Sequence, residues 1–518
     1  ILCNNRIILA LMLFKSFKKG NIAMKYISTR GLKQSLTSAE AIIAGIANDG
    51  GLFVPTEIPQ IDADFIDSLI NLSYQDRAKK ILEKFLVDYS EMELTNCVNN
   101  AYGFNKFDDS KVAPVVSAGD NHILELWHGP TSAFKDMALQ LLPQLMATAL
   151  KKTGEKSQIV ILVATSGDTG KAALEGFKDV EQIKILVFYP DNGVSQIQRL
   201  QMITQEGSNV KVIAVDGNFD DAQTGVKKIF NNEDFNANLK NNNIQLSSAN
   251  SINWGRLVPQ IVYYFSAYAD LLQSGKISVG TKVNFVVPTG NFGNILAGYY
   301  AKLMGLPIHK LICASNANNV LTDFLNTGIY DRNRPFYKTS SPSMDILISS
   351  NLERLLYALT NADDSKINKW MKELNDEGQY KVDAEVLTSI KENFWSDFAD
   401  DVNTAETIKT VFEEKGYTLD PHTAVAWYVA DKYKKTTKDE LPLVIVSTAS
   451  PYKFNENVLG ALDSDIAATL TDEFAVLDKL AEITKVKVPE GLASLRTAKV
   501  IHTDKCQKEE MAKFITKI

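Results

Sequence analysis

A lysine in an unusual setting is the first residue whose type and position could do chemistry. The segment His128–Asp136 reads HGPTSAFKD, so a Gly-Pro turn precedes a helix-forming run that places Lys135 in the first turn of a helix. The helix dipole disfavours a positive charge there, and a lysine with a depressed pKa is a better nucleophile for imine formation. Considered alone, Lys135 also fits a solvated surface lysine, which is the commoner case.

The segment Ala164–Lys171 reads ATSGDTGK and is expected to lie between a strand and a helix. Hydroxyl groups and free backbone N–H groups at a helix N-terminus form an anion site. A nucleotide-binding P-loop is excluded, because Thr165 stands where that motif needs Gly and Ala172 stands where it needs Ser or Thr. An ordinary helix cap at Ser166 or Asp168 fits this segment equally well.

A third segment, Pro288–Asn294, reads PTGNFGN and again separates a predicted strand from a predicted helix. Gly290 and Gly293 allow the backbone to approach a ligand closely, and the helix start supplies aligned N–H donors, so the segment suits a phosphate. It does not match G-x-G-x-x-G, which argues against a dinucleotide. The alternative is a plain turn that needs left-handed residues.

The fourth segment, Ser447–Pro451 (STASP), follows an apolar run. Ligands of open α/β sheets bind at the carboxyl ends of the strands, so the Thr448 hydroxyl is a candidate ligand group. In isolation, a threonine that caps its own turn explains this segment better.

These segments need a sheet whose strand ends bring them together, and the chain alternates strand and helix patterns accordingly. Apolar runs predict strands at 158–164, 183–189, 210–215, 283–287, 311–314, 443–446 and 498–502. Helical patterns cover 38–47, 73–85, 91–102 and 222–230, and also most of 340–415. Continuous apolar strands separated by helices imply a parallel sheet that is covered on both faces.

The composition is that of a globular protein. Of 518 residues, 45% are hydrophobic and 23% are charged, and the net charge of -7 argues against a nucleic-acid partner. The four cysteines form no C-x-x-C pair, so we expect neither a disulfide framework nor a metal site. A reducing compartment, the cytoplasm, fits this cysteine usage. Beyond the first 23 residues, no segment reads as a membrane span.

Residues 1–23 stand apart from the rest of the sequence. The apolar run Ile7–Phe14 is too short to span a bilayer. A signal peptide would carry its basic residues before such a run, whereas here they follow it at Lys15, Lys18 and Lys19. We therefore expect a non-native extension, with translation starting at Met24.

Taken together, the four segments resemble threonine synthases of the longer microbial and fungal type. The opening MKYISTRG, the run DGGLFVP and the run SSANSINWGR, which ends at Arg256, fit the same family. The resemblance extends essentially from Met24 to the end of the chain. It implies a two-domain α/β fold of the tryptophan-synthase-β type (fold type II), with pyridoxal 5'-phosphate (PLP) in the cleft between the domains.

The resemblance also implies a domain plan and a set of residue roles. A mostly helical N-terminal region would cover 24–105, a small α/β domain 156–245, and a large PLP domain 106–155 and 246–518, in a monomer or homodimer. Lys135 would bind PLP covalently and act as the catalytic base, and Thr448 would meet the pyridine nitrogen. The loop that holds the PLP phosphate matches Gly290, Asn291, Phe292, Gly293 and Asn294. The substrate loop matches Thr165, Ser166, Asp168 and Thr169, and the candidates for the substrate phosphate are Lys171 and Arg256.

The implied reaction removes phosphate from O-phosphohomoserine and adds water to give threonine, the last step of threonine biosynthesis. Two alternatives stay open. A threonine dehydratase or cysteine synthase would share the lysine and the phosphate loop, but those families lack the long N-terminal region and generally have Asn where Asp168 stands. A threonine-synthase-like protein with a changed role is the other alternative. One departure is visible, because the family usually has His where this chain has Ser450.

Overall fold

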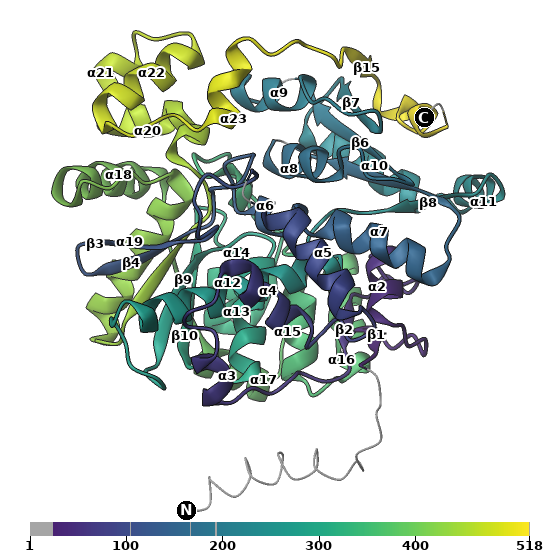
Figure 1. Cartoon of the computed structure of the whole chain (residues 1–518), viewed down its shortest axis with the longest axis horizontal. Coiled ribbons are helices and arrows are strands. Elements are labelled where there is room, and N and C mark those ends of the chain that lie inside the picture. Colours follow the sequence, from purple (N-terminus) through teal and green to yellow (C-terminus); the bar gives the residue numbers. More distant parts are fainter. Residues whose placement is uncertain (1–23, 104, 166, 192–193, 517–518) are drawn as a thin grey trace, which may run out of the picture.

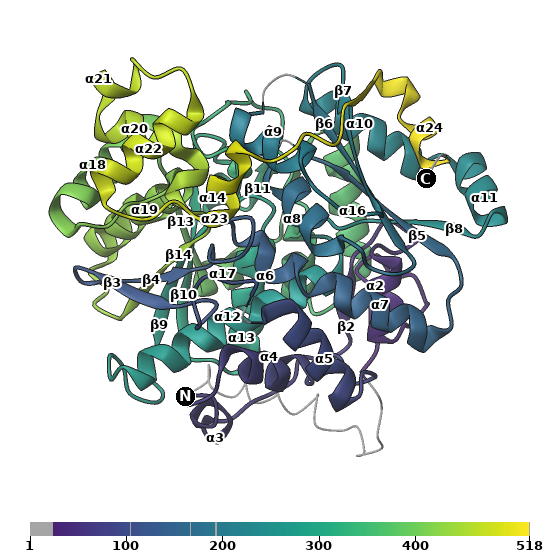
Figure 2. The ribbon, with the colours of Figure 1, turned by 45° about the horizontal axis from the view of Figure 1, so that its top comes forward.

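Two sheets covered by helices form the framework of the protein (Figures 1 and 2). The computed structural model describes residues 24–103, 105–165, 167–191 and 194–516. The predicted non-native extension at 1–23 lies outside the described residues, so its prediction stays untested. Within the described ranges, no helix combines the length and the apolar character needed to cross a membrane.

The larger sheet has six strands in the order β13-β10-β9-β14-β4-β3. Neighbouring strands run parallel, except that β3 and β4 form an antiparallel hairpin at one edge. The strands are β3 (Val115–Ala118), β4 (Asn121–Glu125), β9 (Val283–Pro288), β10 (Ile308–Ser315), β13 (Phe394–Phe398) and β14 (Leu443–Ser447). Because β4 pairs with β14, the loop before Lys135 and the loop that carries Thr448 leave the sheet side by side.

The smaller sheet has five parallel strands in the order β15-β7-β6-β5-β8. They are β5 (Gln158–Ala164), β6 (Ile183–Pro190), β7 (Val210–Val215), β8 (Ile244–Ser247) and β15 (Asp504–Cys506). Alternate residues of β5 enter two different cores: Ile161 and Val163 lie on one face, and Val160 and Leu162 on the other. Burial on both faces explains why this strand is a continuous apolar run.

The predicted strands are confirmed with one exception. The C-terminal strand predicted at 498–502 lies instead at Asp504–Cys506, where it pairs with β7 of the smaller sheet. The predicted domain boundary at 245 falls inside β8, and the last strand of the predicted large domain 246–518 belongs to the smaller sheet. The sequence does not indicate this pairing, because β15 is only three residues long, is mostly polar, and lies far along the chain from β7.

Helices cover both faces of the smaller sheet. Helix α8 packs on one face of β5 and β6, and α10 packs on the opposite face. The helices of this part are α7 (Leu142–Thr153), α8 (Asp168–Phe177), α9 (Gln196–Ile203), α10 (Phe219–Phe230), α11 (Glu233–Asn241) and α24 (Ala512–Ile515).

The larger sheet is covered by α12 (Trp254–Gln273) and α13 (Gly293–Met304), which pack on each other, and by α19 (Pro421–Thr437). Helix α19 lies across β9, β10 and β14. The remaining elements beside this sheet are α14 (Val320–Thr327), α15 (Leu352–Leu359), α16 (Asp364–Asp376), α17 (Ala384–Asn393), α18 (Asp401–Lys415) and the antiparallel pair β11 (Ile329–Asp331) and β12 (Gln379–Lys381).

The N-terminal region is mostly helical, as predicted, and packs on the framework through α2 and α4, which contact α7 and α12 respectively (Figure 2). Its helices begin at side-chain caps on Thr37, Asp62, Ser73 and Ser90. The elements are β1 (Tyr26–Ser28), α2 (Ser38–Ala44), β2 (Phe53–Pro55), α3 (Ala63–Asp67), α4 (Tyr74–Leu82) and α5 (Glu91–Tyr102).

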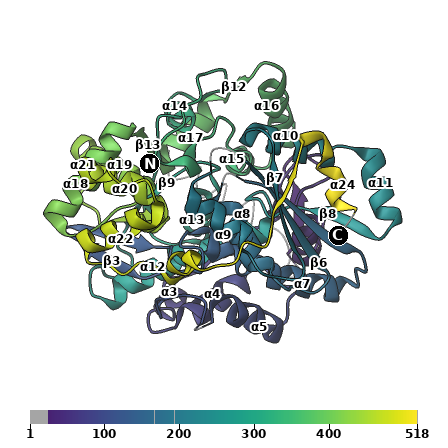
Figure 3. The same cartoon turned by 90° about the horizontal axis from the view of Figure 1, so that it is seen from above.

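The C-terminal part crosses the molecule from the helices beside the larger sheet to the smaller sheet (Figure 3). Its helices are α20 (Asn455–Leu462), α21 (Ser464–Ala467), α22 (Glu473–Thr484) and α23 (Glu490–Ala493). The backbone N–H groups of Ile501 and His502 both donate to the carbonyl of Ile203 at the end of α9. These bonds fasten the crossing segment to the smaller sheet just before β15.

Candidate active site

Lys135 is the first residue of the short helix α6 (Lys135–Leu139), as the sequence predicts. Its side chain is buried, and Nζ lies 3.1 Å from Oδ2 of Asp168 and 3.0 Å from Oγ of Ser343. Burial lowers the pKa of Lys135, and the charges of Lys453 and Arg256 act in the same direction against the carboxylate of Asp168. A buried amine of this kind is suited to nucleophilic chemistry and proton transfer.

The loop before α6 is held in shape by Asp136. Its carboxylate accepts the backbone N–H of Thr131 at 2.7 Å and the Thr131 hydroxyl at 2.8 Å. A Cβ at Gly129 would lie 2.6 Å from Cβ of Asp136, so only glycine fits there. Ser132 adopts a left-handed conformation with φ of 58°, which is uncommon for a residue other than glycine. The contacts of Gly129 and Thr131 with Asp136 therefore fix the loop that leads into Lys135.

Asp168 is the charged centre of the site. Its Oδ2 meets Lys135 and the Ser343 hydroxyl, and its Oδ1 lies 3.1 Å from Nζ of Lys453 and 3.2 Å from Nε2 of Gln198. Burial opposes its charge, but the charges of Lys135 and Lys453 outweigh burial and hold the pKa of Asp168 well below its usual range. The carboxylate is therefore ionised at neutral pH.

A buried histidine positions Ser343. The backbone N–H of Ser343 donates to Nε2 of His422 at 3.2 Å, and Nδ1 of His422 lies 2.9 Å from Oδ1 of Asp420. Because Nε2 accepts a hydrogen bond, the ring carries a proton on Nδ1 and donates a hydrogen bond from there to Asp420. Asp420 also caps α19 by accepting the N–H groups of His422 and Thr423. The turn that carries Ser343 is thus tied to the start of α19.

The Thr448 loop lies against the Lys135 loop. The Phe134 N–H donates to the Thr448 carbonyl at 2.8 Å, and the Ser450 N–H donates to the Ser132 carbonyl at 3.0 Å. Thr448 is buried beside Lys135 in this way. Ser450, which stands where the resembling family has His, uses its hydroxyl to accept the N–H of Tyr452. The fourth sequence segment therefore reaches the site, as predicted.

The predicted phosphate loop forms the uncapped start of α13. No side chain caps this helix, and Phe292 at its N-cap has φ of 63°. The left-handed residue of the turn is thus Phe292, not one of the two glycines that the sequence suggests. Gly290 is required for another reason, because a Cβ there would lie 2.8 Å from the Ser343 carbonyl oxygen. Gly293 is less confined, since an added Cβ would meet no heavy atom closer than 3.5 Å.

Asn294 lies in the first turn of α13 and has an unused donor. Its Oδ1 accepts the hydroxyls of Tyr263 at 2.6 Å and Tyr264 at 2.8 Å, whereas its buried Nδ2 has no partner among the described residues. Asn291 is an exposed residue. Its backbone carbonyl accepts hydrogen bonds from the backbone N–H and from the side-chain N–H of Asn351. An uncapped helix start beside an orphaned amide donor suits an anion such as a phosphate.

The two candidate cations for the substrate phosphate differ in their surroundings. Arg256 is buried at the start of α12 and donates to the Ala249 carbonyl at 2.7 Å, and no ion pair joins it to a described carboxylate. Burial lowers the pKa of Arg256 to about 10. Lys171 is already paired with Glu175 at 3.2 Å, and it also contacts Gln205. Arg256 is therefore the cation with capacity left for an anion.

The remaining predicted residues are at the start of α8. The hydroxyl oxygen of Thr165 accepts the N–H groups of Gly167 and Gly170, so Thr165 shapes the loop. Thr169 is half-buried in the first turn of α8. Ser166 lies outside the described residues, and its predicted role stays a prediction.

Ser343, His422, Asp420, Lys453 and Gln198 complete the site but were not predicted. Only Asp420 carried a local signal, since Asp followed by Pro421 is a typical helix start. The other four have ordinary sequence neighbours and reach Lys135 through the tertiary fold.

The residues present fit PLP. The amine of Lys135 can bind an aldehyde, the start of α13 with the unpaired Nδ2 of Asn294 can bind a phosphate, and Ser343 joins these two regions. Ser343 contacts Lys135 through its hydroxyl and packs on Gly290 through its carbonyl.

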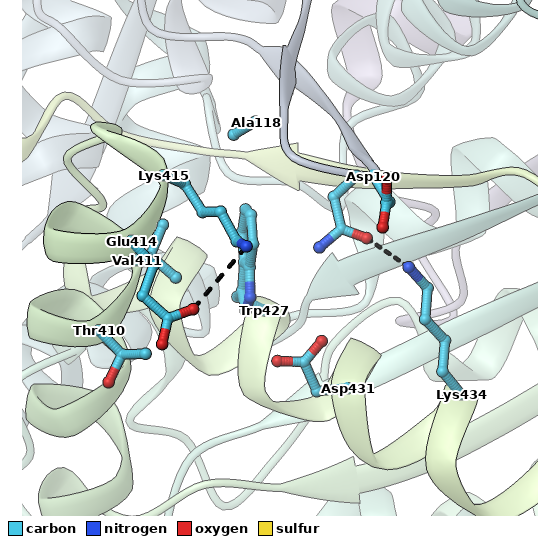
Figure 4. A pocket seen from close by; sticks show the side chains of 10 residues that line it. Ala118, Asp120, Thr410, Val411, Glu414, Lys415, Trp427, Asp431 and Lys434 are labelled. Carbon is cyan, nitrogen blue, oxygen red and sulfur yellow. Dashed lines mark hydrogen bonds and ion pairs between the residues drawn. The ribbon is translucent and has the colours of Figure 1, made fainter.

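A separate pocket of about 200 Å³ lies between α18, α19 and the turn of the β3–β4 hairpin (Figure 4). None of its lining residues is a predicted site residue. The side chains that line it include Asp120, Glu414, Lys415, Trp427, Asp431 and Lys434.

Comparison with known proteins places three family models on the chain. "Threonine synthase N terminus" matches residues 25–102, "Pyridoxal-phosphate dependent enzyme" matches 123–384, and "Threonine synthase, C-terminal" matches 423–498. Human Threonine synthase-like 1 is 44% identical over 82% of this chain, and the chain spans 58% of the length of that protein. Threonine synthase of Saccharomyces cerevisiae is 39% identical over 95% of this chain and 99% of the yeast protein.

Solved structures agree with these sequence matches. The crystal structure of yeast threonine synthase has a TM-score of 0.85 at 38% identity and covers 96% of this chain and 99% of that chain. The PLP-bound threonine synthase of Brucella melitensis has a TM-score of 0.84 at 37% identity and covers 95% of this chain and 98% of that chain. The fold is therefore that of a fold-type-II PLP enzyme with an added N-terminal region, and the chain belongs to the threonine synthase family.

Proposed function

We propose that this protein converts O-phosphohomoserine and water to threonine and phosphate in a PLP-dependent reaction. The observation that carries the proposal is the buried Lys135 amine, held by Asp168 and Ser343 beside an uncapped helix start with an unpaired amide donor. Such a site can hold a cofactor aldehyde and a cofactor phosphate at the same time. The near-complete overlap with yeast threonine synthase supports the substrate.

In this proposal the chain supplies binding, orientation and proton transfer. PLP, when bound, withdraws electrons from the α-carbon of an amino-acid substrate. Lys135 takes the α-proton on Nζ, because burial lowers its pKa and keeps the neutral amine accessible. Lys135 is also the group within reach that can return a proton to the γ-carbon. The burial of Lys135 and Asp168 excludes bulk water from these transfers.

The substrate phosphate requires a cation, and Arg256 is the better of the two predicted candidates. Its guanidinium is buried and forms no ion pair with a carboxylate among the described residues, so a bound phosphate would serve as its counter-ion. Lys171 would have to leave Glu175. Thr165, Ser166, Asp168 and Thr169 would line the substrate side of the same loop, and Thr448 would face the pyridine nitrogen.

The deciding experiment is an assay of the purified full chain with PLP and O-phosphohomoserine. Release of phosphate together with an equal amount of threonine, identified by chromatography, is the expected result. A protein that binds PLP but releases no phosphate from this substrate would contradict the proposal.

A changed substrate is the second candidate, because some of the relatives carry the name Threonine synthase-like 1, and the human one is 44% identical. The same assay separates the two candidates when O-phosphohomoserine is compared with threonine and O-acetylserine. Turnover of threonine or O-acetylserine alone would favour a dehydratase or a cysteine synthase activity.

We further propose a cytoplasmic protein that is a monomer or a homodimer and has no nucleic-acid partner. We also propose that residues 156–245 move as a small domain against the larger one during turnover, with β15 moving as part of the small domain. Light scattering after size exclusion measures the mass of the particle. Small-angle scattering with and without substrate would detect the closure.

A further inference from the structure

Lys453 is a second lysine at Asp168, and its position in the site is unlike that of Lys135. Its side chain is fully buried, and Nζ donates to the Thr131 carbonyl at 2.8 Å and lies 3.1 Å from Oδ1 of Asp168. Lys135 meets the other oxygen of the same carboxylate, Oδ2, at 3.1 Å. One aspartate is therefore shared by two lysines, with one lysine on each oxygen.

The two lysines differ in what else they can do. Lys135 begins α6 and reaches the hydroxyl of Ser343, so its nitrogen faces the region where a cofactor would bind. Lys453 lies behind the loop that precedes α6, where the carbonyl of Thr131 fixes it. Its side chain is 0% exposed, so the Asp168 carboxylate and the Thr131 carbonyl take the place of its hydration.

We infer that Lys453 is a positioning residue that gives Asp168 a second ion-pair partner and thereby lets Lys135 lose and regain its proton. If Asp168 had only Lys135 as a partner, deprotonation of Lys135 would leave a buried carboxylate with no counter-charge, which is costly. With Lys453 on the second oxygen, the carboxylate keeps one cation through every protonation state of Lys135. The inference rests on the proposed function, since it concerns the residue that would carry PLP.

The charges around Lys135 come from four parts of the chain. Asp168 on α8 is the anion, Lys453 follows β14, Arg256 begins α12, and His422 on α19 faces Asp168. A neutral residue at 453 would remove one cation and leave the full field of Asp168 on Lys135. The nitrogen of Lys135 would then hold its proton more tightly, so its titration would move to higher pH.

The negative charge of Asp168 is what requires a second cation behind this loop. A neutral side chain there would need no lysine behind it. We therefore expect the effect of Lys453 on the titration of Lys135 to depend on the negative charge of Asp168.

The test is a double-mutant cycle in the PLP-loaded full chain with K453M, D168N and the combined variant. The readout is the pH titration of the absorbance of the bound cofactor, which reports the protonation of the Lys135 nitrogen. K453M should raise the midpoint by about 1 pH unit and D168N should lower it. In the D168N background the K453M change should shift the midpoint much less than in the parent, because Lys453 acts through Asp168. K453R keeps the charge and should titrate like the parent.

Three outcomes would overturn the inference: a K453M midpoint equal to that of the parent, a K453M shift of the same size with and without D168N, or a K453R variant that shifts as far as K453M. If K453M does not fold, K453Q, which keeps an N–H donor for the Thr131 carbonyl, takes its place in the cycle. A parent that binds PLP and titrates normally but makes no threonine would refute the proposed function while leaving this test intact.

Discussion

The cluster around Asp168 and the pocket of Figure 4 both combine lysines with carboxylates, but they differ in depth. Around Asp168, the side chains of Lys135, Asp168 and Lys453 are 10%, 6% and 0% exposed. In the pocket of Figure 4, Lys415 and Glu414 are 40% and 62% exposed, and their charged atoms are 3.8 Å apart. The residue types are the same, but water screens the second cluster and not the first.

Depth therefore decides which charges can direct chemistry. In the buried cluster each carboxylate oxygen has an assigned partner, and the pKa of Lys135 falls while that of Asp168 is held low. In the exposed pocket, Lys434 donates to the amide oxygen of Asn121 instead of to a carboxylate. Substitutions in the two clusters should differ by orders of magnitude in effect.

The largest effect is expected at Lys135. Lys135→Ala should lower threonine formation by at least about 100-fold, because the group that transfers the protons is lost. In the parent, borohydride reduction followed by peptide mapping should place the cofactor on Lys135. Label on any other lysine would refute the assignment of this residue. Lys302→Ala, which changes a half-buried lysine bonded to the His309 carbonyl outside the site, is the control for a general loss of charge.

The second-largest effect is expected at Asn294, whose Oδ1 accepts two hydrogen bonds and whose Nδ2 has no partner among the described residues. Asn294→Asp keeps the oxygen that accepts from Tyr263 and Tyr264 but replaces the unpaired donor with a second oxygen. PLP binding should weaken by about 10- to 100-fold, as expected for the loss of a hydrogen bond to a charged group. Tyr263→Phe is the control, and equal losses of affinity in the two variants would argue against a phosphate at Nδ2.

A smaller effect separates the two glycines of the phosphate loop. Gly290→Ala would bring a Cβ to 2.8 Å from the Ser343 carbonyl, whereas Gly293→Ala would meet nothing closer than 3.5 Å. Gly290→Ala should reduce the free energy of unfolding by about 1–3 kcal/mol, and Gly293→Ala should leave it nearly unchanged. Urea unfolding of both proteins measures the difference, and the close packing of Ser343 on Gly290 would be disproved by equal stabilities.

At Thr448 a single hydroxyl is tested. Thr448→Val keeps the shape of the side chain and the backbone bond to Phe134, but removes one hydrogen-bonding group. Turnover should fall by an amount that corresponds to about 0.5–1.5 kcal/mol, and PLP content should stay constant because the start of α13 still holds the cofactor. An unchanged rate and an unchanged cofactor spectrum would show that Thr448 only shapes its turn.

The smallest effect is expected in the exposed pocket. Glu414→Gln and Lys415→Met should each change the free energy of unfolding by less than about 0.5 kcal/mol, because screened surface charges contribute little. Threonine formation should equal that of the parent. A loss of activity in either variant would mean that this pocket communicates with the site around Asp168, and the contrast between the clusters would no longer hold.

Much of the fold could be predicted because its strands are buried on both faces. Runs such as Gln158–Ala164 and Val210–Val215 appear in the structure with the predicted bounds. The hairpin of β3 and β4 and the strand β13 were not predicted, because they are short and polar residues interrupt their apolar runs. The strand β15 was misplaced for the same reason.

The site was predictable only where a motif lies next to a strand end. Lys135 and Asp168, from two of the four segments, lie side by side in the structure. The Thr448 segment contacts the loop before Lys135, and Gly290 packs on the turn that carries Ser343. Ser343 and Lys453 could not be found from local patterns, since each acts through a residue hundreds of positions away. Pairings of this kind depend on how the two sheets meet, which no short window of sequence contains.

The pairing of β15 with β7 has a consequence for synthesis on the ribosome. Strands β5 to β8 emerge in one continuous stretch, whereas β15 emerges only after every strand of the larger sheet. Until then β7 is a bare edge strand with unpaired N–H and C=O groups, which is a template for association with another nascent chain. The last strand therefore closes an aggregation-prone edge, and chains that stop short of it should be the ones that depend most on chaperones.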